Sequence, residues 1–388
     1  MRFNCAEKLR ITPREPGMTE ETLTALNPPT VLADFLAASA SPAELAPYLG
    51  ALTPRQLDAP EAETGALLFG AAAHDLGWLR RIAVRGEDRF RWLSGMVTNG
   101  VETLPDKEGA YNLVLNAQGR IQGDCYVWRE GEALEVEVTA EQADALAAHF
   151  DRFIIMDDVE LVPVTGQSAL GLTGPRAEDI LKKLGLPAPA ALASSHGIVD
   201  DIAVRLFRGY GNIVPHYALW ADAARIPALW RAMLAAGATA VGVESLETLR
   251  IAEGIPAYGI DIQSRDLAQE TAQERALSFT KGCYLGQEIV ERIRSRGQVH
   301  RHLRAVELTA DSSPELPGIG AELRIAGSAP EAKPAGTLTS VATLQLPGAR
   351  RIFAITMIRA EAEVGNQPLT YSGGTAKILY NPPKFDAA

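Results

Sequence analysis

Cysteine is scarce in this 388-residue sequence, which contains only Cys5, Cys125 and Cys283. An odd and sparse count excludes a disulfide-stabilised scaffold and is typical of a reducing compartment. Because no two of these residues form a CxxC pair, one chain cannot build a four-cysteine zinc site or hold an iron–sulfur cluster with its own thiols. No metal site is therefore predicted.

Long hydrophobic runs are also missing. No stretch approaches the roughly 20 apolar residues that span a bilayer. The start of the sequence, MRFNCAEKLRITPREPG, has no apolar signal core. We therefore expect a soluble, cytoplasmic protein with no membrane partner.

Basic residues are outnumbered by acidic ones. Lys and Arg total 37 and Asp and Glu total 48, which gives a formal net charge of −11. This balance excludes a generally basic nucleic-acid coat protein but is compatible with a local basic patch. Hydrophobic residues at 47% and charged residues at 22% are typical of a folded globular chain.

The length allows about two or three domains. Residues 1–60 are rich in proline and are predicted to form an N-terminal extension. Residues 61–165 and 166–240 each mix strands and helices, and part of 240–295 is expected to complete the first of these domains. Residues 296–388 contain short strands at near-regular spacing with Gly and Pro turns, which indicates a C-terminal β-barrel.

Adjacent pairs of strands in the two mixed domains favour an α+β fold with antiparallel sheets over a doubly wound parallel sheet. Residues 110–116 and 120–128 are β-rich and flank a short turn that contains a glycine, so we expect a hairpin. Thr139 and Gln142 have the spacing of a capping box, which predicts the start of a helix.

The densest group of reactive side chains lies in KGCYLGQE, residues 281–288. Gly282 and Gly286 bracket Cys283 and permit the backbone to approach a ligand closely. Lys281 and a helix that begins near Gly286 would stabilise the thiolate, so Cys283 is the first candidate for catalysis or redox chemistry. The alternative interpretation is a buried, inert cysteine in a tight turn.

KGCYLGQE, followed by Arg292, resembles the signature of the YgfZ family of folate-binding proteins, which shares its fold with the T-protein of the glycine cleavage system, an aminomethyltransferase. The resemblance covers roughly residues 62–385. Four other stretches agree with it in order along the chain: RIAVRGEDRFRWLSGMVTN, YNLVLNAQGRIQGDCYVW, LRIAEGIPAYGIDI and GTLTSV.

The resemblance implies a multi-domain T-protein-like ring around a central channel that binds tetrahydrofolate or a derivative. It implies an accessory role in assembling or repairing iron–sulfur proteins, with indirect consequences for tRNA modification. The expected partners are folate, which can carry a polyglutamate tail, and iron–sulfur client or assembly proteins. A conventional enzyme is not expected; the alternative is a folate-dependent aminomethyltransferase.

The residues predicted to bind the cofactor lie in three of these stretches. Arg250 offers a planar fork of donors suited to a carboxylate or a pteridine edge, and Tyr258 offers a ring that stacks on a flat heterocycle. The alternative is a surface pair of Arg250 with Glu253 and a Tyr258 that belongs to the core. The full predicted set is Asn116, Arg250, Glu253, Tyr258, Lys281, Tyr284, Gln287 and Arg292.

Two departures from the T-protein count against aminomethyl transfer. Where the T-protein carries two aspartates in the central hairpin, this sequence has Gly123 and Asp124, so Asp124 is a doubtful catalytic residue. Where the T-protein has an acidic residue that holds the pteridine ring, this sequence has Asn212, Pro215 and His216.

A basic run follows the cysteine motif. It would attract the polyglutamate tail of folate, or RNA, and direct action on tRNA is the third functional hypothesis. The alternative is a solvated helix and linker face. His300 and His302 have strand spacing for a metal pair but lack a third ligand. The run consists of Arg292, Arg294, Arg296, His300, Arg301, His302 and Arg304.

Overall fold

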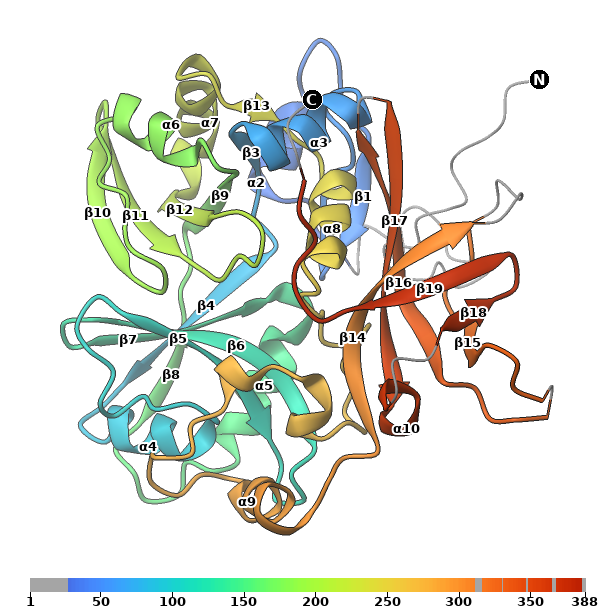
Figure 1. Cartoon of the computed structure of the whole chain (residues 1–388). Helices are drawn as coiled ribbons and strands as arrows, with labels where there is room; N and C mark the ends of the chain where they lie inside the picture. The colour runs from blue at the N-terminus through green and yellow to red at the C-terminus, as the bar shows by residue number, and fades with distance from the viewer. Residues whose placement is uncertain (1–26, 311–315, 330, 347, 365–367, 386–388) are drawn as a thin grey trace.

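The computed structural model of the chain contains two mixed α/β units, a small hairpin and a closed barrel, which meet at helix α8 (Val243–Ala252) (Figure 1). The predicted α+β class with antiparallel sheets and a C-terminal barrel is confirmed. Residues 1–26 of the predicted extension lie outside the described residues. The structure describes residues 27–310, 316–329, 331–346, 348–364 and 368–385.

The first unit is built on a five-stranded antiparallel sheet in the order β5–β6–β7–β4–β8. Strand β6 alternates between buried and less buried side chains over most of its length, every residue of β5 is buried, and α4 (Arg89–Met96) and α5 (Ala140–Asp151) supply residues to the same core. The predicted hairpin is formed by β5 and β6. The strands are β4 (Leu79–Arg85), β5 (Gly109–Leu115), β6 (Ile121–Glu130), β7 (Ala133–Thr139) and β8 (Glu160–Pro163).

The second unit has a six-stranded sheet in the order β10–β11–β12–β9–β3–β13, in which only β3 and β13 are parallel to each other. Helices α6 (Ala177–Lys183) and α7 (Ile226–Ala235) pack with it in a second core. The strands are β3 (Ala72–Asp75), β9 (Gln167–Thr173), β10 (Ser194–Val199), β11 (Ile202–Arg208), β12 (His216–Asp222) and β13 (Thr239–Ala240).

Strand β3 departs from the predicted domain boundaries. It comes from the segment assigned to the first domain, yet it pairs with β9 and β13 in the second sheet. Its small side chains Ala72 and Ala73 are fully buried there. The predicted first domain, residues 61–165, contains both β3 and β4. In the structure the chain crosses from the second sheet to the first between these two strands.

The described part of the predicted N-terminal extension packs against the body of the protein. The hydroxyl of Tyr48 donates to Glu247 of α8 at 2.8 Å, and Thr30 and Thr53 donate to the buried carboxylate of Asp75. These residues therefore close one side of the core. The elements are α2 (Val31–Ala37), β1 (Leu45–Tyr48), β2 (Ala51–Pro54) and, after it, α3 (Pro60–Phe69).

The C-terminal barrel closes in the order β14–β17–β16–β15–β18–β19. Phe353 and Ile355 of β17 are fully buried in the core that also contains α8 residues. The strands are β14 (Arg301–Ala310), β15 (Glu322–Ile325), β16 (Gly336–Leu346), β17 (Ala349–Arg359), β18 (Leu369–Tyr371) and β19 (Gly374–Leu379). The remaining elements are η2 (Ala223–Arg225), η3 (Ala268–Thr271), η4 (Glu274–Ala276), α9 (Gln287–Arg296) and α10 (Ala360–Glu363).

Arg81 of β4 fixes the two sheets relative to each other. Its buried guanidinium pairs with Glu137 at 2.7 Å and lies 3.8 Å from the ring centroid of Phe207, which belongs to the other sheet. The indole of Trp220 donates to the same Glu137 carboxylate at 3.1 Å. This cluster fixes the distance between the two sheets. A cavity lies next to it.

Among the described residues, none of the helices has both the length and the apolar character needed to cross a membrane.

Candidate functional site

A cavity of about 260 Å³ lies between the two sheets and α8. Its volume is close to the lower end of the ~300–1,000 Å³ range of small-molecule sites. Aromatic side chains make up much of the wall, and polar groups stand between them, which is the usual composition of such sites. The aromatic residues are Tyr48, Trp78, Tyr111, Tyr126, Trp128, Phe207, Tyr210, Tyr217 and Tyr258.

The aromatic wall is ordered by ring contacts. Tyr126 stacks on Trp128 with an interplanar angle of 10°, and Tyr111 lies 5.3 Å from Tyr126 between ring centroids. The indole nitrogens of Trp78 and Trp128 are buried, and neither has a hydrogen-bond partner among the described residues. A buried donor without a partner costs about 1–3 kcal/mol.

Asp124 of β6 lines the cavity with a buried carboxyl group. Its Oδ2 accepts from the Tyr111 hydroxyl at 2.8 Å, and its Oδ1 accepts from the Gln142 amide at 2.9 Å. Desolvation raises the pKa of Asp124 in spite of these hydrogen bonds. The group is therefore easier to protonate than an exposed aspartate, which suits proton exchange with a bound heterocycle.

The predicted capping box is wrong, and the reason lies at Asp124. Thr139 precedes α5 but makes no capping bond, because Gln142 turns its amide toward Asp124 and its carbonyl oxygen accepts from the Asp124 backbone N–H at 3.0 Å. The same packing explains Gly123. A Cβ at position 123 would lie 2.8 Å from the side-chain ends of Gln142 and Leu146, so a residue larger than glycine there requires these two side chains to move.

Arg250 lines the cavity, but its hydrogen-bond donors are occupied by acceptors within the protein. The guanidinium pairs with Glu247 at 2.6 Å and Asp261 at 2.7 Å, and it also donates to the Ile255 carbonyl and the Ser340 hydroxyl. These contacts involve all five N–H groups, so the predicted fork is not free for a ligand. Arg250 instead ties α8 to the following loop and to the barrel.

Glu253 lines the cavity as well, and its carboxylate holds the loop before β12. Its Oε1 accepts from the backbone N–H groups of Ile213 and Val214 at 2.9 and 3.2 Å, and its Oε2 lies 2.9 Å from Nε2 of His216. The surface pair of Glu253 with Arg250 does not form. The carboxylate shapes the wall by positioning His216, which also lines the cavity.

A hydrogen-bonded chain continues from His216 into the second sheet. Nδ1 of His216 lies 3.1 Å from the Thr173 hydroxyl, which lies 3.0 Å from Nε2 of His74. Burial lowers the pKa of His74 to about 4. The ring occupies the space over Gly171, where any Cβ would meet it at 1.8 Å.

Tyr258 is a partly buried cavity residue on the loop after α8. Desolvation, reinforced by the carboxylates of Asp124 and Asp266, raises the pKa of its hydroxyl. The ring remains a phenol at neutral pH and offers a face for stacking and a hydroxyl for hydrogen bonding.

The cysteine motif does not line the cavity. Lys281 turns its ammonium toward the end of α4, where it donates to the carbonyls of Ser94, Val97 and Asn99. Burial lowers the pKa of Lys281 to about 7, while the three carbonyl acceptors hold its protons in place. Because its donors are occupied there, Lys281 anchors the loop and does not provide the predicted stabilisation of the Cys283 thiolate.

Cys283 is exposed, so the interpretation as a buried cysteine is wrong. Helix α9 begins at Gln287 after Gly286, whose positive φ of 82° suits glycine. The Gln287 side chain accepts from the Tyr284 backbone N–H at 3.3 Å and closes the loop. The motif therefore presents its thiol on a structured surface loop.

The other predicted residues near this loop are placed as follows. Tyr284 is buried, and its ring lies 4.9 Å from the Lys281 ammonium. Asn116 shapes the β5–β6 turn, where its side chain accepts from two backbone N–H groups, and it packs beside Gly286. Arg292 is exposed on α9. The predicted set thus divides into a cavity group and a surface-loop group.

The basic run is not a continuous positive patch. Arg301 pairs with Asp266 and Glu270, while His302 and Arg304 both contact Glu363. These acidic partners come from distant parts of the sequence. The result weakens the prediction that the run attracts polyglutamate or RNA.

Arg275, which the sequence analysis missed, lies beside the cavity. Its guanidinium carbon is 4.4 Å from the ring centroid of Tyr210 and 5.5 Å from that of Tyr111, and both rings line the cavity. No sequence motif contains Arg275. Only the folded structure brings it to these two aromatic residues.

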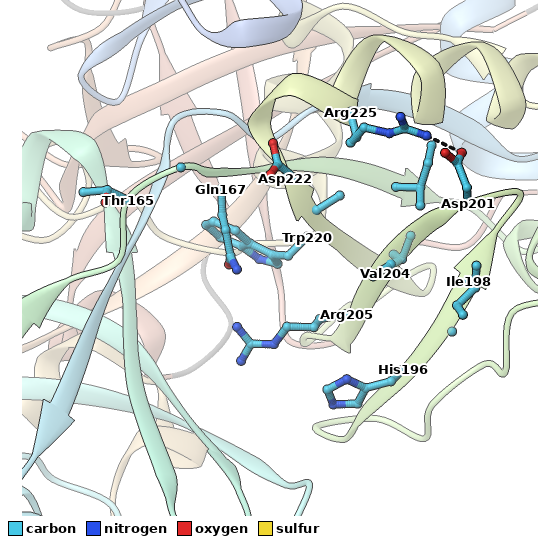
Figure 2. Close-up of a pocket in the computed structure, with 15 residues that line it drawn as sticks. Thr165, Gln167, His196, Ile198, Asp201, Val204, Arg205, Trp220, Asp222 and Arg225 are labelled. Atoms are coloured by element: carbon cyan, nitrogen blue, oxygen red, sulfur yellow. Dashed lines mark hydrogen bonds and ion pairs between the residues drawn. The ribbon is translucent and has the colours of Figure 1, made fainter.

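A wider groove of about 880 Å³ lies at the outer end of the second sheet (Figure 2). Arg225 and Asp201 form an ion pair at one end of it, and Arg205 projects into it from β11. Arg205 is neutralised by Glu130 at 2.6 Å and Glu135 at 2.9 Å. None of the predicted site residues lines this groove, so the aromatic cavity between the sheets is the better candidate site.

The two mixed units and the closed barrel define a class of folds, and a solved structure shares this fold. The crystal structure of glycine cleavage system aminomethyltransferase T from Bartonella henselae superimposes with a TM-score of 0.77, covering 90% of this chain and 95% of that one at 18% identity. The chain belongs to the family described as the GCVT N-terminal domain, which matches residues 39–281.

Curated relatives agree with this assignment. The aminomethyltransferase of Rubrobacter xylanophilus is 28% identical over 261 residues, which cover 66% of this chain and 70% of the relative. An Arabidopsis thaliana protein, named only provisionally as a chloroplastic transferase, is 25% identical over 252 residues. That match covers 63% of this chain and 58% of the relative, so the chain spans just over half of its length.

Proposed function

We propose that the central cavity binds tetrahydrofolate or a derivative and that the protein is an accessory factor of the YgfZ type, serving the assembly or repair of iron–sulfur proteins. The observation that carries the proposal is the cavity itself, where stacked aromatic rings surround a buried carboxyl group. A reduced pterin is flat and rich in N–H donors and acceptors, and it complements such a wall.

The chemistry of the wall supports this ligand. Trp78 and Trp128 line the cavity and contribute aromatic surface that suits a flat pterin ring. The Asp124 carboxyl matches its N–H groups. When bound, tetrahydrofolate supplies the one-carbon chemistry of its nitrogens, while these side chains bind and orient the ring.

Two features favour an accessory role over aminomethyl transfer. Position 123 is a glycine packed against the side chains of Gln142 and Leu146, so it supplies no second carboxylate beside Asp124. The exposed Cys283 stands on an anchored surface loop, where a client protein can reach it. A single thiol would act there as a transient ligand or redox partner, because one cysteine cannot hold a cluster alone.

Binding of the full chain to tetrahydrofolate, measured by anaerobic calorimetry, tests the proposal. Ala218 lines the cavity from β12, and Ala218→Trp is expected to weaken binding by at least ~10-fold because the indole fills the space. Ala203→Trp, at an exposed position on β11, is the matched control. Equal affinities for both variants, or no binding to the wild type, would reject the cavity as a folate site.

The accessory role is tested by complementation in cells that lack their own YgfZ-type accessory protein. Cys283→Ser is close to isosteric and is expected to keep folate affinity but to fail in supporting iron–sulfur enzymes. Full complementation by this variant would remove Cys283 from the proposed role.

A second candidate function is folate-dependent aminomethyl transfer. The position of Asp124 on the cavity wall favours it, and so do the relatives named aminomethyltransferase. It predicts that the chain forms methylene-tetrahydrofolate and ammonia from an aminomethylated carrier protein, and that Asp124→Asn abolishes the reaction. Absence of product from a preparation that binds tetrahydrofolate would exclude it.

A further inference from the structure

Arg275 is held in a fixed position at the edge of the cavity. It lies in the short helix η4, whose carbonyl groups are tied to the first unit: Asn99 donates to the Arg275 carbonyl at 3.0 Å, and Thr98 donates to the Ala276 carbonyl at 2.6 Å. The guanidinium rests on the Tyr210 and Tyr111 rings. The side chain is therefore oriented before any ligand arrives.

The charge of Arg275 is not neutralised by the protein. Among the described residues, no carboxylate lies within 4.0 Å of its guanidinium, although Glu274 is its neighbour in the chain. Among the described residues, its one side-chain hydrogen bond is to Oδ1 of Asn212 at 3.3 Å, and its buried Nε has no hydrogen-bond partner. Arg250 on the cavity wall is different, because it pairs with two carboxylates.

The size of the cavity determines which part of a bound ligand reaches the Arg275 guanidinium. A space of about 260 Å³ holds a flat head group and little more, so a longer ligand must extend past the lining residues. Tyr210 is a partly buried lining residue, and Arg275 stacks on it. A guanidinium with free donors binds a carboxylate through two parallel hydrogen bonds.

We propose that Arg275 is a specificity-determining residue that binds a carboxylate on the tail of the cavity ligand, with Asn212 and Tyr210 holding its guanidinium in place. The ligand class is a planar heterocycle joined to an aryl-glutamate tail. The inference rests on the proposed function and extends it, since it assigns recognition of the tail to one residue outside the basic run.

Three probes separate the head from the tail: tetrahydrofolate, a tetrahydropterin without the tail, and p-aminobenzoylglutamate, which is the tail without the pterin. Affinities are measured by calorimetry for tetrahydrofolate and by ligand-observed NMR for the fragments, on the full chain and on Arg275→Gln. Arg231→Gln is the matched control, because Arg231 also stacks on an aromatic ring, at 4.8 Å from Phe35, but belongs to α7.

Arg275→Gln is expected to weaken tetrahydrofolate and p-aminobenzoylglutamate by roughly 10- to 100-fold and to leave tetrahydropterin binding unchanged. Arg275→Lys should restore part of the loss. An equal loss for tetrahydropterin, or p-aminobenzoylglutamate binding that is absent or independent of Arg275, overturns the assignment. If tetrahydropterin does not bind the wild type while the tail fragment still binds through Arg275, the cavity is not a pterin site: the proposed function fails and the carboxylate site stands.

Discussion

The Glu253 carboxylate lies 2.9 Å from Nε2 of His216, and together these residues join the end of α8 to the start of β12 on the cavity wall. The side chain of Glu253 is fully buried. Its other oxygen accepts from two backbone N–H groups of the loop that carries Ile213 and Val214. One carboxylate thus fixes the shape of a wall formed by two distant segments.

Removing this carboxylate is expected to be costly, and the cost depends on the replacement. Glu253→Ala leaves two buried N–H groups and the His216 ring without their partner, so we expect the free energy of unfolding to fall by about 3–5 kcal/mol. Glu253→Gln keeps a carbonyl acceptor for the N–H groups and should cost about 1 kcal/mol. Urea denaturation of both variants measures the difference, and similar losses would show that the carboxylate's hydrogen bonds do not set the stability.

Local patterns in the sequence predicted most of the architecture. The short strands at near-regular spacing after residue 300 predicted the barrel, and β16 shows the expected alternation of buried and less buried side chains. The turn between β5 and β6 needed a residue with positive φ, and Gly119 supplies it at 70°. Such features depend on neighbours in the chain, which the sequence displays directly.

The site was harder to predict because its contacts are distant in sequence. Arg250 was expected to face a ligand, but Asp261 and Ser340, the latter 90 residues away, use its donors. Glu363 neutralises Arg304 in the same way. Arg275 carried no local signal, because its role depends on Tyr111 and Tyr210 from two other segments. Spacing along the chain does not reveal which charges the fold will pair.

Acid pH should destabilise the protein through His74. Its folded pKa of about 4 lies below the ordinary value near 6.5, so the unfolded chain binds a proton in a range where the folded chain does not. The contribution of the neutral ring to stability is complete above pH 6.5 and is lost as the pH falls from 6.5 toward 4. At about 1.4 kcal/mol per pKa unit, the loss amounts to a few kcal/mol.

Urea midpoints at several pH values between 7.5 and 4.5 measure this effect. Wild type should lose more stability across the range than His74→Gln, which cannot titrate there. His300→Gln, at an exposed histidine, is the control and should follow the wild type. Parallel profiles for wild type and His74→Gln would mean that His74 does not cause the pH dependence.

Lys281 should stabilise the cysteine loop without contributing to the cavity. Lys281→Met leaves the carbonyls of Ser94, Val97 and Asn99 without their shared donor, and we expect a loss of about 1–3 kcal/mol in the free energy of unfolding. Faster amide exchange should be confined to residues 278–286 and the end of α4. Lys182→Met, at an exposed position in α6, is the matched control.

Tetrahydrofolate affinity of Lys281→Met should equal that of the wild type, because no residue of the motif lines the cavity. Iodoacetamide should label Cys283 in both proteins and label Cys125 in neither, since Cys125 is buried in β6 and burial raises the pKa of its thiol. Peptide mapping by mass spectrometry distinguishes the two sites. A fall in folate affinity without any loss of stability would contradict this separation and would join the loop and the cavity into one site.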